Sequence, residues 1–300
     1  MIITSLIKIK NMIIDRKFLV IVILFTFIMF MGDSPISDGK TNNTLIYMLL
    51  HYTKEELAGM GEELSSINII LRMREFKWLT ILFPVFVTYC GSFDYYNCMI
   101  TNYKRCGQIR TTRKKYIITN FVAPIMNAGI TLTVSFIAFS LLVFALFPDI
   151  SMCEGITYKV SFFSKFFGIS GVEKLRNYLF MYFNLLLISF LYMSVVVIFL
   201  EMLKDIFFAV SIPMVISYTG YMILNYHLAK LFENYGFDYS MSKIKYEIIN
   251  PIIMINADYQ FENIFGKSYL LFAGILIVFN VVLNLILIRW INRRMRFQEM

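Results

Sequence analysis

Long apolar runs alternate with shorter polar stretches along the chain. A helix needs about 20 apolar residues to cross a hydrocarbon layer of ~30 Å. Four runs reach that length, and the first two are shorter but are flanked by basic residues that can extend outward. The pattern predicts an all-α integral membrane protein, one transmembrane domain over residues 1–300. Its six predicted spans are about 17–32, 77–93, 116–148, 177–200, 206–227 and 268–289.

The composition supports this class. The chain is 58% hydrophobic and only 16% charged, and its mean hydropathy is +0.67. A soluble domain carries roughly 25% charged residues. The polar stretches are also too poor in apolar residues to bury a core of their own, so a soluble fold is excluded.

Basic residues set the orientation, because Lys and Arg concentrate in the cytoplasmic loops of membrane proteins. With the N-terminus inside, the inner segments hold 15 of the 28 Lys and Arg but only five of the 20 acidic residues. The pattern predicts cytoplasmic N- and C-termini. It assigns the basic surplus to topology and to anionic lipid rather than to nucleic acid. The predicted extracellular segments are 33–76, 149–176 and 228–267, and the main cytoplasmic loop is 94–115.

Helices are predicted outside the spans as well. Residues 2–15 carry one polar and one apolar stripe, which favours a helix lying in the headgroup plane over a basic extension of the first span. Thr53 and Glu56 fit a capping box, and apolar residues then recur at helical spacing. These features predict one helix from about Lys54 to Arg74. Its paired glutamates are expected to form a solvated face.

Signatures of enzymes are missing. Two sequences ending in Gly-Lys-Thr and Gly-Lys-Ser imitate a phosphate-binding loop, but each lacks the first glycine of that motif. The cysteines do not have zinc-ligand spacing. The apolar runs contain no Asp, Glu, Lys or Arg, whereas proton relays and intramembrane proteases usually need ionisable residues at depth. We therefore expect no catalytic residue, no metal site and no cofactor bound by this chain.

Asparagines are the most polar residues within the spans. Asn280 and Asn284 are four residues apart and therefore share one face of the last helix. They could line a translocation surface, or they could bond to neighbouring helices and fix the packing. The sequence leaves both interpretations open.

The loop 94–115 mixes six basic residues with aromatic and apolar ones. A purely solvated loop would not need these apolar side chains, whereas a short helix docking into a groove of a partner would. An amphipathic segment resting on lipid is the alternative. The candidate contact residues are Asp94, Tyr95, Tyr96, Met99, Ile100, Tyr103 and Arg113.

The layout resembles the membrane subunits of type-2 ATP-binding-cassette (ABC) exporters. The shared features are an acidic residue after the second span, an amphipathic stretch, and a basic Thr-Thr-Arg-Lys-Lys-Tyr sequence (111–116) leading into the third span. A short charged loop, Glu201 to Asp205, joins the fourth and fifth spans. Asn250-Pro251 precedes the last span, and a basic tail follows it.

The resemblance implies a mechanism and partners. Two such subunits, identical or sister, would form a dimer around an export path, and each would bind a separate ATPase that carries ATP and Mg²⁺. Closure of the ATPases would move a coupling helix at about Asp94–Tyr103. Glu201 and Asp205 would lie in a secondary contact. The composition suggests a bacterial chain, and the resemblance then implies the cell membrane.

A different class remains open. The extracellular segments are large, so the chain could instead be an immunity or sensor protein that binds a peptide through its outer loops. A neighbouring gene for a soluble ATPase would distinguish the two classes. The sequence does not identify a substrate.

Overall fold

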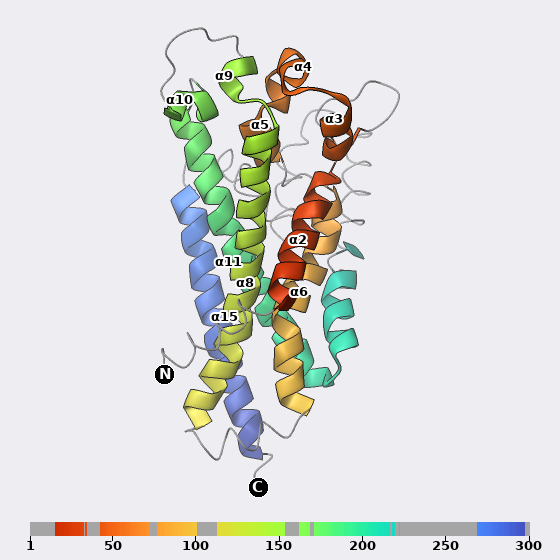
Figure 1. Ribbon diagram of the computed structural model, residues 1–300. Coiled ribbons are helices and arrows are strands. Elements are labelled where there is room, and N and C mark those ends of the chain that lie inside the picture. The colour runs from red at the N-terminus through yellow and green to blue at the C-terminus, as the bar shows by residue number, and fades with distance from the viewer. Residues whose placement is uncertain are drawn as a thin grey trace, which may run out of the picture. The chain divides into compact units, whose positions relative to one another are not determined.

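The computed structural model describes residues 16–32, 34, 43–72, 77–100, 113–153, 162–168, 171–216, 218–219, 222 and 269–297. Within these ranges the chain is helical and contains no strand. Figure 1 labels the helices. They are α2 (Arg16–Phe30), α3 (Leu45–His51), α4 (Lys54–Gly59), the 3₁₀ turn η1 (Glu62–Leu64), α5 (Ser66–Arg72), α6 (Lys77–Ile100), α8 (Arg113–Leu146), α9 (Ile150–Cys153), α10 (Phe162–Phe167), α11 (Gly171–Leu203) and α15 (Tyr269–Phe297).

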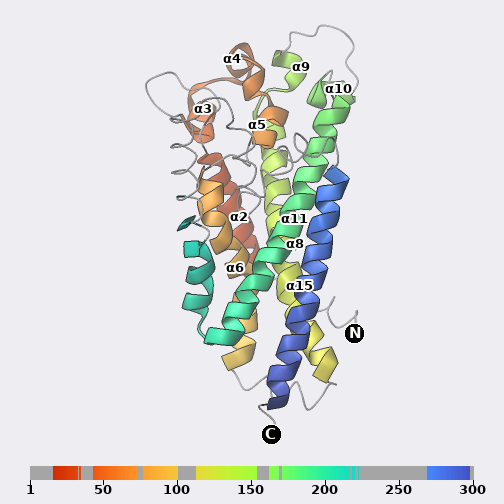
Figure 2. The ribbon, with the colours of Figure 1, turned by 180° about the vertical axis from the view of Figure 1, so that it is seen from behind.

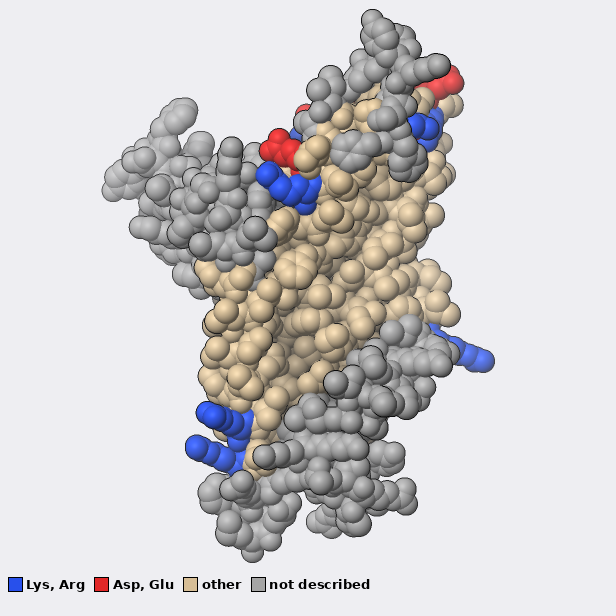
Figure 3. All heavy atoms as spheres, turned by 90° about the vertical axis from the view of Figure 1, so that its left-hand side faces the viewer, with Lys and Arg blue, Asp and Glu red and all other residues tan. Residues whose placement is uncertain are grey.

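Three helical stretches of the described chain are long and apolar enough to cross a membrane: Phe121–Cys153, Gly171–Leu203 and Gly274–Arg293. They correspond to the third, fourth and sixth predicted spans, and they indicate a membrane protein. On the face that Figure 3 shows, the described surface between the two ends is a broad tan area without Lys, Arg, Asp or Glu. The all-helical class is thus confirmed. Six spans and the cytoplasmic termini stay predictions.

The other three spans are described only as shorter or partial elements. The first corresponds to α2, which has 15 residues, and the second lies within α6. The fifth is described as the helix Ile206–Ile216. The N-terminal stretch 2–15, residues 101–112 of the predicted cytoplasmic loop and the whole segment 228–267 lie outside the described residues.

Several helices continue past the predicted membrane limits. α6 does not end at residue 93 but runs to Ile100, so the start of the predicted loop 94–115 is helical and continuous with the second span. α15 likewise continues into the basic tail. The prediction placed helix ends where charge begins, but a helix needs only satisfied backbone hydrogen bonds and can extend into the polar layer.

The prediction of a single helix over residues 54–74 is wrong in one respect, because the helix is interrupted. The Thr53–Glu56 capping box is present. However, α4 ends at Gly59, and Gly61 has a φ of 124°, which only glycine adopts readily. The chain then forms η1 and starts again as α5. The apolar period persisted across the break because Leu57, Leu64 and Ile67 are all buried.

The chain divides into two compact units. The first comprises residues Met1–Ile21, Leu82–Leu132 and Asn184–Met300. The second comprises Val22–Ile81 and Thr133–Phe183.

In the second unit, α2 packs on the later half of α8. Phe25 lies against Phe136 and Phe30 against Phe139, with ring centroids 5.6 and 4.9 Å apart. The Thr26 hydroxyl donates to the backbone oxygen of residue 135. This bond satisfies a polar group within a helix pair that is otherwise held by aromatic packing.

Residues 53–72, which contain α4, η1 and α5, form a cap over the end of α8. Figure 2 shows this cap from behind. The Ser66 amide donates to the Pro148 oxygen at 2.9 Å, and the Lys54 ammonium lies 3.5 Å from the Ala145 oxygen. The Ala145 carbonyl is one of those that the end of α8 leaves without a helical partner, and Pro148 lies two residues beyond that end. Nearby, the buried Asp149 carboxylate pairs with Lys165 of α10 at 3.3 Å.

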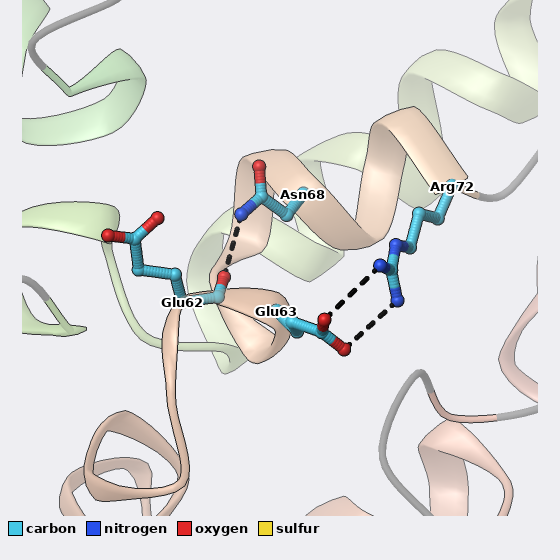
Figure 4. A network of polar contacts seen from close by, with 4 residues as sticks. All are labelled: Glu62, Glu63, Asn68 and Arg72. Atoms are coloured by element: carbon cyan, nitrogen blue, oxygen red, sulfur yellow. Dashed lines mark hydrogen bonds and ion pairs between the residues drawn. The ribbon is translucent and has the colours of Figure 1, made fainter.

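The cap is braced by a small polar network (Figure 4). Arg72 contacts both carboxylate oxygens of Glu63, at 3.1 and 3.4 Å. The Asn68 amide donates to the Glu62 backbone oxygen at 2.7 Å. These contacts fix α5 against η1. Because Glu63 and Arg72 are about half exposed, the ion pair adds little stability and mainly sets geometry.

In the first unit, α6, α8 and α11 approach closely at two glycines. A Cβ on Gly91 would lie 2.7 Å from the Pro124 oxygen of α8 and 2.7 Å from the Met193 sulfur of α11. A Cβ on Gly129 would lie 2.7 Å from Phe190 Cδ1 and closer still to Cε1. Small residues allow such close backbone contact between membrane helices.

Candidate functional site

The clearest polar link in the first unit joins two segments that the sequence marked separately. The Tyr95 hydroxyl of α6 donates to the Glu201 carboxylate of α11 at 2.5 Å. Both side chains are buried, with 8% and 6% of their surfaces exposed. A hydrogen bond to a carboxylate in such surroundings is stronger than one between neutral groups. The end of α6 is therefore tied to the end of α11.

Immediately after Glu201 the chain makes a tight turn. The Lys204 amide closes α11 by donating to the Leu200 oxygen at 2.9 Å, and Lys204 itself has a φ of 55°. The Asp205 carboxylate then accepts from the Phe207 amide at 2.7 Å, and its backbone oxygen accepts from the Ala209 amide. Asp205 is thus the N-cap of the helix Ile206–Ile216, a position that favours aspartate.

This turn lies at one end of the first unit. The last residues of α6, α11 and α15 and the first residues of α8 gather there, at the lower end in Figure 1, and Figure 2 shows the same from behind. These are the segments that the basic residues assign to the cytoplasm. Tyr96, the neighbour of Tyr95, is half-buried at this end.

The remaining predicted contact residues are only partly described. Asp94, Met99 and Ile100 lie on the last two turns of α6, and Arg113 is the first residue of α8. Tyr103 lies outside the described residues. Tyr95 was predicted to be a contact residue for a partner, but its side chain is buried within the chain. A side chain covered in this way links helices and does not present a surface to a partner.

The two asparagines of α15 bond to α11. The Asn280 amide donates to the Leu187 oxygen at 3.2 Å and to the Leu276 oxygen at 2.9 Å. The Asn284 amide donates to the Asn280 oxygen, and its own side-chain oxygen accepts from Ser194 at 3.1 Å. The two residues therefore hold α15 against α11, as the packing interpretation expects of them. No described contact assigns them to a translocation path.

Three residues of this region were not singled out from the sequence. Ser194 lies within an apolar run, and its bond to Asn284 joins positions 90 residues apart. Gly91 and Gly129 gave no signal either, because a lone glycine in a span is common. A search for small or hydroxyl residues at one face of each span could have found all three.

Asn184 of α11 is the opposite case. It is 1% exposed, and neither its amide nitrogen nor its oxygen has a hydrogen-bond partner. A buried polar group without a partner lowers stability. The buried Asn184 side chain therefore weakens the packing of α11 and makes no polar contact that would hold it.

The described residues hold no group of three or more His, Cys, Asp or Glu placed to bind a metal ion. The features of this end of the first unit suit the transmission of motion. They are the long helix α6, the buried bond between Tyr95 and Glu201, and the turn capped by Asp205. Comparison with protein-family models, with curated proteins and with solved structures gives no match. Function is therefore argued from this geometry and from the sequence layout.

Proposed function

We propose that the chain is the membrane-spanning subunit of an ABC exporter of the type-2 kind. The observation that carries the proposal is the bond between Tyr95 and Glu201. The resemblance assigned these residues to two separate cytoplasmic contacts, and the bond makes them parts of one buried link. A motion applied to either segment would reach the other.

The physical basis is a continuous lever. α6 runs without interruption from Lys77 to Ile100, so a displacement at residues 94–100 is carried along the whole helix. Through Tyr95 the same displacement acts on α11, and through the Asp205 cap on the next helix. ATP binding elsewhere would then bias a bundle with two packing arrangements through rigid elements.

The partners follow from this role. An ATPase subunit binds the cytoplasmic end and carries ATP and Mg²⁺. A second copy or a sister subunit completes the path, and the whole lies in a bacterial cell membrane. This chain has no catalytic residue in the scheme and binds no nucleic acid.

The first experiment is affinity purification of the chain from its native membrane, followed by mass spectrometry. A soluble ATPase in stoichiometric amount is expected. Recovery of the dimer without any ATPase would refute the proposal.

The second experiment tests the link. In Tyr95→Phe the ATPase should still bind, but stimulation of its ATP turnover by the membrane subunit should fall at least threefold. Tyr89→Phe, an exposed tyrosine of the same helix, is the matched control and should behave as wild type. Equal stimulation in all three proteins would show that Tyr95 does not couple.

The folded cap favours a second candidate, a sensor or immunity protein that binds a peptide on its outer surface. α4 and α5 are held on the end of α8 by backbone and side-chain bonds, which is more order than a plain connecting loop needs. Retention of partner binding and activity after replacing 53–72 by a flexible linker would exclude this candidate.

A further inference from the structure

The turn between α11 and the helix Ile206–Ile216 exposes an unusual set of side chains. Met202 and Leu203 precede the turn and are 55% and 43% exposed. Phe207 and Phe208 follow it and are 69% and 54% exposed. Four large apolar side chains therefore surround a two-residue turn, although turns that face water are usually polar.

The polar groups of the turn are arranged differently. The backbone amides of Lys204 and Phe207 are satisfied within the chain, by the Leu200 oxygen and the Asp205 carboxylate described above. The Asp205 carboxylate is engaged as a helix cap. Lys204 is the exposed charge of the turn, and its backbone is left-handed.

We propose that this turn is a lipid anchor, with its four apolar side chains among the upper acyl carbons and Lys204 against lipid phosphates. Hydrogen bonds within the chain lower the cost of placing these amides near the hydrocarbon. Lysine is suited to the boundary because its apolar stem can lie along the chains while its ammonium reaches the phosphate layer. Further apolar side chains are exposed on the following helix, at Val215 and Ile216.

The length of α11 is compatible with this placement. Crossing the hydrocarbon takes about 20 residues, and α11 has 33. With Leu203 at one boundary, the opposite boundary falls near residue 184, so the charged residues of the helix start, Glu173, Lys174 and Arg176, lie outside the hydrocarbon. Glu201 lies next to the first boundary, where it is buried and bonded to Tyr95.

The assignment differs from the secondary ATPase contact that the resemblance implies for residues 201–205, and it does not depend on the proposed function. Under it, the turn is covered by lipid in the purified chain. An exposed turn waiting for a protein partner would instead be open to water until that partner is added.

The test uses a single tryptophan in the full-length chain, with Trp78 and Trp290 replaced by Phe. Phe207→Trp is the reporter, and Glu55→Trp in α4, an exposed charged position, is the water-exposed control. Both are reconstituted in phosphatidylcholine vesicles containing phosphatidylglycerol. Quenching is measured with acrylamide and with lipids brominated at shallow or deep acyl positions.

We expect the reporter to be quenched at least twofold more by shallow than by deep bromines, and at least threefold less by acrylamide than the control. Removing phosphatidylglycerol, or adding Lys204→Gln, should reduce the shallow quenching, and Lys204→Arg should retain it. Acrylamide quenching equal to that of the control would overturn the lipid anchor. Lipid quenching that is unchanged both by removal of phosphatidylglycerol and by Lys204→Gln would overturn the phosphate contact.

Discussion

A methyl group added at Gly91 should destabilise the first unit because it meets backbone and not only a side chain. The Cβ of Gly91→Ala would lie 2.7 Å from the Pro124 oxygen, whereas ordinary contacts begin near 3.4 Å. The Met193 sulfur, at the same distance, can move away by rotation. The Pro124 oxygen belongs to α8, so α6 and α8 must separate by about 0.7 Å.

The magnitude follows from overpacking. An extra methyl group that forces backbone shifts in a well-packed core costs about 1–3 kcal/mol. α11 is affected as well, because its Met193 fills the same space. We therefore expect Gly91→Ala to lower the free energy of unfolding by an amount in this range.

The assay is equilibrium unfolding of the purified chain in mixed micelles, followed by circular dichroism. Gly274→Ala in α15 is the matched control, because nothing lies within 4 Å of the added Cβ. That variant should remain within about 0.5 kcal/mol of wild type or gain slightly from alanine's helix propensity. If Gly91→Ala proves as stable as Gly274→Ala, the close approach of α6 to α8 is refuted.

Three further outcomes are expected. Gly129→Ala should also destabilise, but its clash is with the Phe190 ring, so adding Phe190→Leu should restore part of the loss, and strictly additive effects would contradict this. Asn184→Leu should be neutral or stabilising because the buried amide has no partner, whereas Asn280→Leu should lose about 0.6 kcal/mol with its bond to α11; the reverse order in unfolding assays would refute the assignment. The Glu56 carboxylate accepts hydrogen bonds from the Thr53 backbone amide and, with a smaller effect, from the Thr53 hydroxyl at the start of α4. These bonds hold the pKa of Glu56 below the usual 4.5. The ionised Glu56 carboxylate therefore contributes its full stabilisation above pH 4.5, and this stabilisation is lost as the pH falls through the lower pKa of the folded state. In a pH titration of stability, Glu56→Gln should lose less stability than wild type on the acid side.

The sequence predicted helices well where one physical cause decides them. The third, fourth and sixth predicted spans coincide with helices long and apolar enough to cross a membrane, because an apolar run of sufficient length has few other uses. The Thr53–Glu56 cap was found because both of its partners lie within one turn. The break at Gly61 was missed, since apolar spacing reports which positions are buried and not whether the helix between them is continuous.

The candidate site was predicted only as residues and not as an arrangement. Tyr95 and Glu201 were both singled out, but they are 106 positions apart, and no local pattern pairs them. The shared face of Asn280 and Asn284 could be predicted from their spacing. Their partners on α11 could not, because the choice of neighbouring helix depends on packing across the whole unit.

The cap over α8 has a consequence for the synthesis of the protein. Ser66 bonds to Pro148, which is made 82 residues later. At roughly 5–20 residues per second this interval lasts about 4–16 s. During that time the cap segment has been translated but its docking site does not yet exist, and Leu64 and Ile67, which it later buries, remain uncovered. A newborn chain therefore passes through a stage in which proteases and chaperones can compete for this segment before its own third span arrives.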